Sequence, residues 1–402
     1  MSEYRILKRP LLTPVTLFFG VLAVIGLILL AKRFIFGLGS VTNLNDGYPW
    51  GIWVVYDIMI GTAFACGGYA LALTVYIFNR GQYHPLVRPA LLASLFGYGL
   101  GGLSAVIDMG RYWNAWQIIN PWQQNFNAVM LEVALCITAY VTILIIEFLP
   151  AVLERFKLET WRRRLDRVLF IFIAIGVVLP TMHQSSLGSL LILFGQKVHP
   201  LWQAVEFLPL LALVSAVTMG FAIVIFEASL VSLKLTREPE THLFAGLGRI
   251  ARWLLVAFLA FRFIDLTRRD AWGYAFDGSF EAFMFWAETA LFILPVILLF
   301  RESRPVHSPG MGRGPILFLS GVCVLLAGAL YRINGVLVGF NPGPGFHYFP
   351  SVEELLVTLG VIAMEVVGYL LVIKLFPVLP KPHPEIDHGK SAATSQAPAA
   401  QA

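Results

Sequence analysis

The chain has 402 residues, of which 58% are hydrophobic and only 13% are charged. Because soluble domains carry about 25% charged residues, this composition excludes an ordinary soluble fold and indicates a polytopic membrane protein. The formal net charge of +5 does not indicate a nucleic-acid partner, because the basic residues lie in short loops between apolar runs, where they set membrane orientation.

Ten apolar runs are each long enough to cross a bilayer core, which needs about 20 helical residues. The sequence therefore predicts an all-α membrane domain over residues 13–378, between an N-terminal segment (1–12) and a disordered tail (379–402). The spans within 52–191 are expected to form one four-helix bundle and those within 202–333 a second, with the first and last spans peripheral. The predicted spans are 13–36, 52–78, 88–110, 127–149, 167–191, 202–233, 243–267, 281–300, 314–333 and 352–376.

The distribution of basic residues predicts how the spans are oriented. Of the 29 Lys and Arg residues, 21 fall on the side of the N-terminus and 8 on the opposite side. The positive-inside rule then places both termini in the cytoplasm. The first apolar run is span-length and has no small-residue cleavage site, so we expect no cleavable signal peptide.

Four loops on the outer side are rich in aromatic residues, Asn, Gly and Pro. They read GLGSVTNLNDGYPWG, RYWNAWQIINPWQQNFN, TRRDAWGYAFDGSFE and RINGVLVGFNPGPGFHYFPSVEE. Two interpretations stay open. The loops can form an aromatic belt at the lipid headgroups, or a docking face for another protein.

The stretch LPTMHQSSLGSLL (179–191) places polar residues inside an otherwise apolar span. Counted from the cytoplasmic end, His183 lies about 24 Å into a core about 30 Å thick, near the outer surface but still inside. Ionisable residues in lipid are costly and usually functional. Three neighbouring spans bring further polar residues to this depth, which predicts a polar pocket formed by Asp57, Asp108, Arg111, Glu132, His183 and Gln184.

Purely structural interpretations of these residues also stay open. Asp108 and Arg111 can pair at i,i+3 at a helix end. Glu132 can be a protonated carboxyl bonded to a neighbouring helix, and Asp57 can bond a loop amide. The two serines after Gln184 are expected to bond their own helix backbone.

A looser set of ionisable residues lies in the other spans. Arg262 and Asp265 can pair at i,i+3. The carboxylates can form a proton path, or they can be protonated groups that only pack between helices. The candidates for the path are Glu147, Glu206, Glu227, Glu288 and Glu365.

The sequence offers few ligands for haem or metal. Cys66, Cys136 and Cys323 form no C-x-x-C pair, so iron–sulfur, structural zinc and c-type haem sites lack ligands. Of eight histidines only His183 lies well inside a span, whereas a b-type haem in the membrane usually takes two. We therefore expect no haem, no iron–sulfur cluster and no metal in this chain, and a diffusible organic carrier for any redox chemistry.

Three stretches carry a family resemblance: NLNDGYPWGIWVVYDIMIGTAFACGGYA, VIDMGRYW and, most specifically, LPTMHQSSLGSLLILFGQKVHPLWQ. They resemble the quinone-reactive membrane subunits of the polysulfide-reductase (NrfD-like) family, and within it those of periplasmic nickel–iron hydrogenases of the hydrogenase-2 type. The resemblance covers most of the chain. It departs from the family pattern at Tyr112, because a proline usually follows the Asp-x-Gly-Arg stretch.

The resemblance implies a haem-free anchor in the bacterial inner membrane that binds menaquinone or ubiquinone near the periplasmic face. It implies docking to a periplasmic ferredoxin-like iron–sulfur subunit, and through it to the hydrogenase small and large subunits. The chain would act only within that hydrogen:quinone oxidoreductase. A separate hypothesis is that the protons come from the cytoplasm, which would make the reaction electrogenic, with Glu147, Glu227 or Glu365 as relay points. The implied catalytic residues are Asp108 and His183, and the implied quinone-binding residues are Arg111, Glu132, Gln184 and Asp57.

Other functions stay open. The chain can be the quinol-oxidising anchor of a polysulfide, nitrite, tetrathionate or sulfite-linked reductase, because the sequence does not encode the direction of electron flow. A secondary transporter or proton channel would favour broken helices at mid-membrane and inverted repeats, whereas this polar cluster lies toward one face. A scaffold without quinone would be insensitive to changes at His183.

Overall fold

A computed structural model describes residues 4–235, 241–302 and 313–381. Within these ranges ten helical segments are long and apolar enough to cross a membrane, which confirms the ten predicted spans and the all-α fold class. The predicted disordered tail lies almost entirely outside the described residues. The spanning segments are Pro14–Phe36, Trp53–Ile77, Gly81–Asp108, Val129–Arg155, Leu169–Leu193, Leu208–Leu230, Leu243–Arg268, Phe280–Arg301, Gly314–Val338 and Val352–Leu375.

The elements follow the chain as long α-helices joined by short 3-10 and π turns. The α-helices are α1 (Pro14–Phe36), α2 (Gly61–Phe64), α3 (Gly67–Ala72), α4 (Val87–Asp108), α5 (Val129–Arg155), α6 (Glu159–Asp166), α7 (Leu169–Leu193), α8 (Leu208–Leu235), α9 (Thr241–Arg268), α10 (Phe280–Glu302), α11 (Arg313–Ile333) and α12 (Val352–Leu375). The 3-10 helices are η1 (Leu38–Ser40), η4 (Gly81–Leu86), η5 (Tyr112–Ile119), η6 (Pro121–Gln123), η7 (Gly195–Lys197) and η8 (Ala271–Ala275), and the π turns are η2 (Trp53–Ile60), η3 (Leu73–Ile77) and η9 (Asn334–Val338). Strand β1 (Tyr4–Arg5) pairs antiparallel with β2 (Leu379–Pro380).

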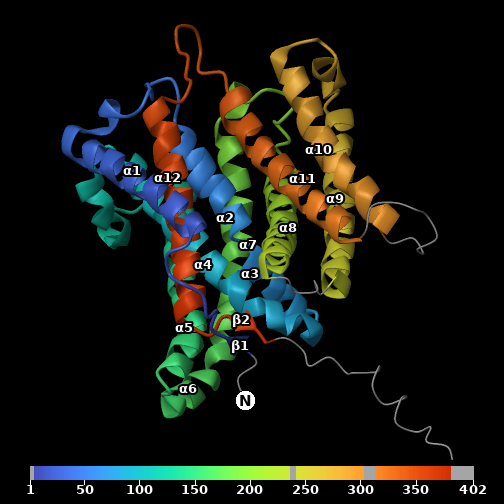
Figure 1. The fold of residues 1–402 in the computed structure, drawn as a ribbon. Helices are drawn as coiled ribbons and strands as arrows, with labels where there is room; N and C mark the ends of the chain where they lie inside the picture. Colours follow the sequence, from blue (N-terminus) through green and yellow to red (C-terminus); the bar gives the residue numbers. More distant parts are fainter. Residues whose placement is uncertain (1–3, 236–240, 303–312, 382–402) are drawn as a thin grey trace, which may run out of the picture.

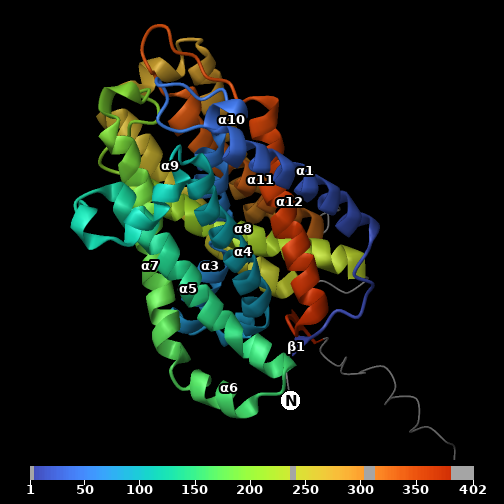
Figure 2. The ribbon, with the colours of Figure 1, turned by 90° about the vertical axis from the view of Figure 1, so that its left-hand side faces the viewer.

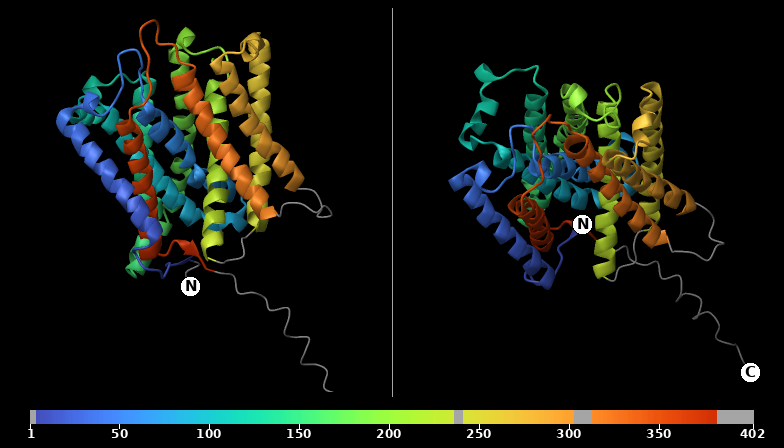
Figure 3. Two further views of the ribbon diagram at one scale, coloured as in Figure 1. Left: turned by 45° about the horizontal axis from the view of Figure 1, so that its top comes forward. Right: turned by 90° about the horizontal axis from the view of Figure 1, so that it is seen from above.

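The spans form one broad helical bundle, with α8 near its centre (Figures 1 and 3). α8 packs against α3 and α7 from the first half of the chain and against α9 and α11 from the second. α5 packs against α4 and α7 (Figure 2), while α10 packs against α9 and α11. α1 and α12 pack along each other at one edge, and α12 also contacts α4. The division into two four-helix bundles stays a prediction.

The second span is not the regular helix that its apolar run predicts. It winds as π turns at its two ends, η2 and η3, and its α-helical segments are interrupted at Ala65 and Cys66. It is the most buried of the ten spans, because α4, α8, α11 and α12 all contact it. π turns inside helices are frequent at functional sites, so this irregular span is where polar chemistry is expected.

Four spans differ from the predicted bounds by five residues or more at one end; the third span also includes η4, and the ninth also includes η9. α8 begins at Leu208 rather than at 202, because Trp202 turns inward and donates a hydrogen bond to Glu288 at 2.9 Å. α5 runs on past residue 149 to Arg155, with Pro150 inside it. Prolines are tolerated in membrane helices because neighbouring groups satisfy the freed backbone atoms.

α1 and α12 approach each other through a pair of glycines. A Cβ atom built on Gly26 would lie 2.7 Å from Gly360 Cα, so a larger residue requires the helices to separate. Lipid tails provide no hydrophobic drive between helices, so membrane helices associate through close packing of small residues. This contact therefore holds the first and last spans together.

Candidate functional site

His183 and Gln184 on α7 meet the irregular second span. His183 Nε2 lies 3.2 Å from the Thr62 hydroxyl, and Gln184 Nε2 donates to the same hydroxyl at 3.2 Å and to the Tyr98 hydroxyl at 3.4 Å. Both side chains are buried, with 1% and 0% of their surface exposed. His183 is the fifteenth residue of α7, which puts it about 21 Å along the helix from the first residue and about 15 Å from the last.

The hydrogen bonds of Thr62 fix the tautomer of His183. The single hydroxyl proton of Thr62 goes to the Ile58 carbonyl, 2.5 Å away. Its oxygen therefore accepts from both neighbours, so neutral His183 carries its proton on Nε2. His183 Nδ1 and Gln184 Oε1 are then buried acceptors, and neither has a hydrogen-bond partner among the described residues. Because buried polar atoms are normally paired, these two acceptors indicate a place for a donor from a ligand or water.

Aromatic rings surround this pair of acceptors. The Tyr98 ring packs edge-on against His183, with centroids 5.6 Å apart, and against Tyr140 at 4.6 Å. Cys66 Sγ lies 3.5 Å from the Tyr98 hydroxyl, and all of these side chains are buried. The low local dielectric of such a site strengthens each hydrogen bond made in it.

Glu132 joins the same face of α7 from α5. Its Oε1 accepts a hydrogen bond of 2.7 Å from Ser186. The prediction that both serines of the motif bond only their own helix is wrong for Ser186, whereas Ser185 does donate to the Met182 carbonyl at 2.8 Å. α7 thus uses three nearly consecutive polar residues to contact three different helices.

Asp57 and Asp108 lie on the second span and at the end of α4. Asp57 is buried and accepts a hydrogen bond of 3.2 Å from Ser104, rather than from a loop amide. Asp108 is half-buried, and Arg111 is exposed beyond the end of the helix. Over the described ranges no ion pair joins Asp108 to Arg111, so the i,i+3 pair does not form. The structure therefore brings Arg111 to none of the other predicted site residues.

Arg33 takes the place beside Asp108 that the sequence suggested for Arg111. Its side chain is fully buried and attracts Asp108 electrostatically. Its Nε and Nη2 atoms donate to the carbonyls of Ile107 and Met109, both at 2.5 Å. An arginine from α1 therefore caps the end of α4, where helix carbonyls lack intrahelical partners.

A second buried polar cluster joins α9, α10, η9 and the loop before α8. Arg262 Nη1 donates to Glu288 Oε1 at 2.5 Å, while Trp202 Nε1 and Asn334 Nδ2 donate to Glu288 Oε2 at 2.9 Å and 2.8 Å. The prediction that Arg262 pairs with Asp265 is wrong, because Glu288 reaches Arg262 from the neighbouring helix. This predicted path residue is thus held by three donors.

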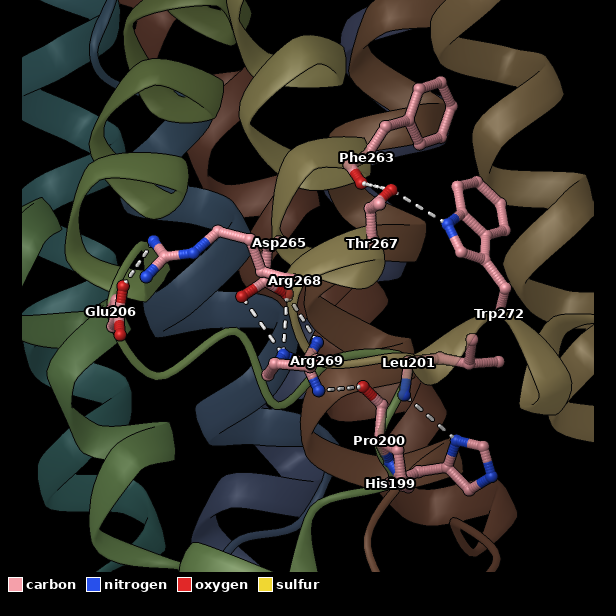
Figure 4. Close-up of polar contacts among 10 residues, drawn as sticks. All are labelled: His199, Pro200, Leu201, Glu206, Phe263, Asp265, Thr267, Arg268, Arg269 and Trp272. Carbon is pink, nitrogen blue, oxygen red and sulfur yellow. Dashed lines mark hydrogen bonds and ion pairs between the residues drawn. The ribbon is translucent and has the colours of Figure 1, made fainter.

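Exposed and half-buried ion pairs hold two other acidic residues near the end of α9 (Figure 4). Asp265 bonds the guanidinium of Arg269, whose Nη1 donates to the Pro200 carbonyl at 2.9 Å. Glu206, another predicted path residue, is exposed and pairs with Arg268 at 2.7 Å. These pairs tie the loop before α8 to the end of α9.

The other three predicted path residues lie on α5, α8 and α12. Glu147 lines a cavity of about 360 Å³ that Arg88 also lines. Glu227 on α8 and Glu365 on α12 interact electrostatically, and Glu365 Oε1 lies close to Gly97 of α4. Among the described residues, the five path candidates do not form one connected chain of hydrogen bonds.

Ten spans of this length and composition define the class of integral membrane proteins, and buried polar atoms without partners lie between the helices. The chain matches the family described as polysulphide reductase, NrfD, over residues 40–338, and it belongs to that family. The match confirms the resemblance carried by the HQSS stretch and its two companion stretches.

Three relatives extend the comparison. The probable Ni/Fe-hydrogenase 2 b-type cytochrome subunit of Escherichia coli is 48% identical over 97% of each chain. A protein of Nitratidesulfovibrio vulgaris is 33% identical over 94% of this chain and 97% of its own. The integral membrane subunit of menaquinone reductase from the same bacterium is 27% identical over 86% of each chain.

The name of the Escherichia coli relative contradicts one prediction. That protein is called a b-type cytochrome subunit, a name that implies haem, so the expectation of a chain without haem is withdrawn. The described residues do not fit a pair of axial histidines: His183 is the one histidine among them recorded as buried, and its ring contacts Thr62 and Tyr98. In the same part of the chain, no three His, Cys, Asp or Glu side chains could hold a metal ion.

Sequence reasoning missed Thr62, Tyr98 and Arg33. The first two are uncharged, and a threonine in a helix usually bonds only its own backbone. The available signal was the run of small residues around them, GTAFACGG and FGYGLGG, which allows helices to approach closely. Arg33 stands at the end of the first predicted span and was counted only among the basic residues of the outer side; its hydrogen-bond partners are backbone carbonyls.

Proposed function

We propose that this chain is the quinone-binding membrane subunit of a nickel–iron hydrogenase complex. It passes electrons from a periplasmic iron–sulfur subunit, and through it from the small and large hydrogenase subunits, to menaquinone or ubiquinone. The names of two relatives, a hydrogenase 2 subunit and a menaquinone reductase subunit, support this assignment. The observation that carries the site is the adjacent pair of buried acceptors without partners, His183 Nδ1 and Gln184 Oε1.

Quinone reduction consumes two electrons and two protons, so the site needs groups that hold a proton at a defined atom. Neutral His183 is fixed by Thr62 through Nε2–H, and its Nδ1 carries no proton, so Nδ1 first takes up a proton. The imidazolium then passes this proton to the reduced quinone oxygen, and neutral Nδ1 accepts a hydrogen bond from the quinol hydroxyl. Glu132 accepts a hydrogen bond from Ser186, which lies three residues after His183 on α7, and Glu132 is the source of that proton. Because both acceptors are buried, the quinone headgroup reaches them only when neighbouring side chains move.

Asp57 and Asp108 complete the proposed site toward the outer end of the spans. Asp108 is balanced by the buried Arg33, so this end of the site holds a carboxylate without excess charge. Arg111, exposed beyond the helix end, is available to the docked iron–sulfur subunit rather than to quinone.

We further propose that both termini are cytoplasmic and that protons enter from that side. Glu147 lines a cavity together with Arg88, near the first turns of α4, and is the entry point of this path. Glu227 and Glu365, which interact electrostatically, are its further members. Glu206 and Glu288 lie outside the path because arginines hold them. Proton uptake from the opposite side of sealed vesicles during turnover would contradict this orientation of the path.

The decisive experiment replaces His183 in the assembled complex and measures two activities. His183→Gln is expected to lower hydrogen-dependent reduction of a menaquinone analogue by about 10²–10⁴-fold, because proton transfer at Nδ1 is lost. Reduction of an artificial dye by the hydrogenase subunits stays unchanged. His199→Gln, in the loop before α8, is the matched control. Unchanged quinone reduction in His183→Gln would contradict the role of His183 in quinone reduction.

One observation favours electron flow in the opposite direction. The two atoms without partners are both acceptors, and a quinol offers hydroxyl donors where a quinone offers none. The chain would then be the quinol-oxidising anchor of another respiratory reductase. The subunits recovered with the chain from native membranes distinguish the cases: hydrogenase subunits support quinone reduction, and a terminal reductase supports quinol oxidation.

A further inference from the structure

A cavity of about 710 Å³ lies where the two ends of the described chain meet, at the bottom of Figure 1. The short strands β1 and β2 pair there, and Leu7 N donates to the Ile373 carbonyl at 3.0 Å. The last turn of α5 and the residues just after it supply the rest of the wall. The cavity is thus built from three segments that are distant in sequence, and it depends on the tertiary fold.

The wall of this cavity is strongly basic. It carries six cationic side chains and one carboxylate, that of Glu154. Glu154 pairs with Arg88 at 3.0 Å and lies 3.6 Å from Arg162, and neither of these arginines lines this cavity. The cationic residues are Arg5, Lys8, Arg9, Arg155, Lys157 and Lys381.

Two of the guanidinium groups are prepared to bind an anion. Arg5 Nε is buried and has no hydrogen-bond partner among the described residues. Arg155 donates through Nε to the Leu375 carbonyl at 2.9 Å, which anchors its guanidinium at the cavity. Planar guanidinium groups match the geometry of phosphate oxygens, and several converging cations repel one another unless an anion lies between them.

The geometry points to a binding site for the phosphate headgroup of an anionic phospholipid. α5 and α12 both end at this cavity, so it lies at the depth of the lipid headgroups. Exposed apolar side chains flank it, namely Leu11, Leu12, Phe156 and Leu375, and Lys374 Nζ holds the Leu11 carbonyl at 3.0 Å beside the end of α12. This apolar rim suits acyl chains, whereas a free phosphate would have no use for it.

The test uses the full-length protein in nanodiscs of phosphatidylcholine, with and without phosphatidylglycerol. Native mass spectrometry after transfer to detergent counts the lipid molecules retained. The variant Lys8→Gln/Lys157→Gln changes two exposed side chains, so it is expected to fold. We expect its affinity for phosphatidylglycerol to fall by about fivefold for each charge removed. Arg163→Gln, an exposed cation on α6 outside the cavity, is the matched control and is expected to retain the lipid.

Three outcomes would overturn the assignment. The first is equal retention of phosphatidylglycerol and phosphatidylcholine by the unmodified protein. The second is loss of phosphatidylglycerol from Arg163→Gln as well as from the double variant, which would indicate a diffuse surface charge effect. The third is displacement of the lipid from the cavity by millimolar inorganic phosphate, together with a rise in Tm on adding phosphate as large as the rise on adding phosphatidylglycerol. That result would identify a site for a free anion.

Discussion

Replacing Thr62 by valine tests the central inference, that one hydroxyl positions the histidine of the site. The two residues have nearly the same shape, so the change removes the acceptor without creating a large cavity. His183 Nε2 loses its one hydrogen-bond partner among the described residues, whereas Gln184 Nε2 keeps the Tyr98 hydroxyl at 3.4 Å. One buried donor left unpaired costs about 1–3 kcal/mol. If this cost raises the free energy of the His183 ring orientation that transfers the proton, the rate of quinone reduction drops by about 5- to 150-fold.

The assay compares hydrogen-driven reduction of a soluble menaquinone analogue with dye reduction in membranes that contain the assembled complex. Thr62→Ser keeps the hydroxyl and is expected to retain most of the activity. Thr74→Val is the matched control, because Thr74 lies on the same span and donates only to the Ala70 carbonyl, at 2.8 Å. Equal activities of Thr62→Val and Thr74→Val would refute the positioning role of Thr62.

Three further predictions concern stability and pH. Glu288→Ala leaves Arg262 buried without its carboxylate, and we expect a loss of about 3–5 kcal/mol in the free energy of unfolding, seen as a lower Tm. Gly26→Ala forces the first and last spans apart at Gly360, and overpacking of this kind costs about 1–3 kcal/mol, which denaturation in detergent would detect. Burial lowers the pKa of His199 below its ordinary 6.5, because the folded protein disfavours the charged imidazole. The stability that neutral His199 contributes is therefore fully present above pH 6.5 and is lost as the pH falls from 6.5 toward the lowered pKa. His199→Gln is expected to flatten that part of the Tm-against-pH curve.

Each of these predictions has a control in the same chain. Glu206→Gln breaks an exposed ion pair and is expected to cost about 0–1 kcal/mol, far less than the change at Glu288. Gly20→Ala lies on the same helix as Gly26 but meets no atom within 4 Å, so it is expected not to lower the Tm. An acid slope that survives in His199→Gln would mean that other groups cause it.

The sequence by itself determined the membrane class, the ten spans and the family. These features depend on properties that are local along the chain: a run of apolar residues is long enough to cross a bilayer or it is not, and the HQSS stretch stands within one helix. The matched region, residues 40–338, runs from before the second span to the end of η9.

The tertiary structure decided which polar groups meet. Thr62 and His183 are 121 residues apart, and Arg33 and Ile107 are 74 apart, so neither contact can be predicted from spacing along one helix. The i,i+3 pairs considered at Asp108 and at Arg262 do not form: Arg262 pairs with Glu288 on α10, and the cation that acts on Asp108 is Arg33 of α1. In the low dielectric of a membrane protein, a buried charge binds the best-placed partner on a neighbouring helix, and only the packing of the helices fixes which partner that is.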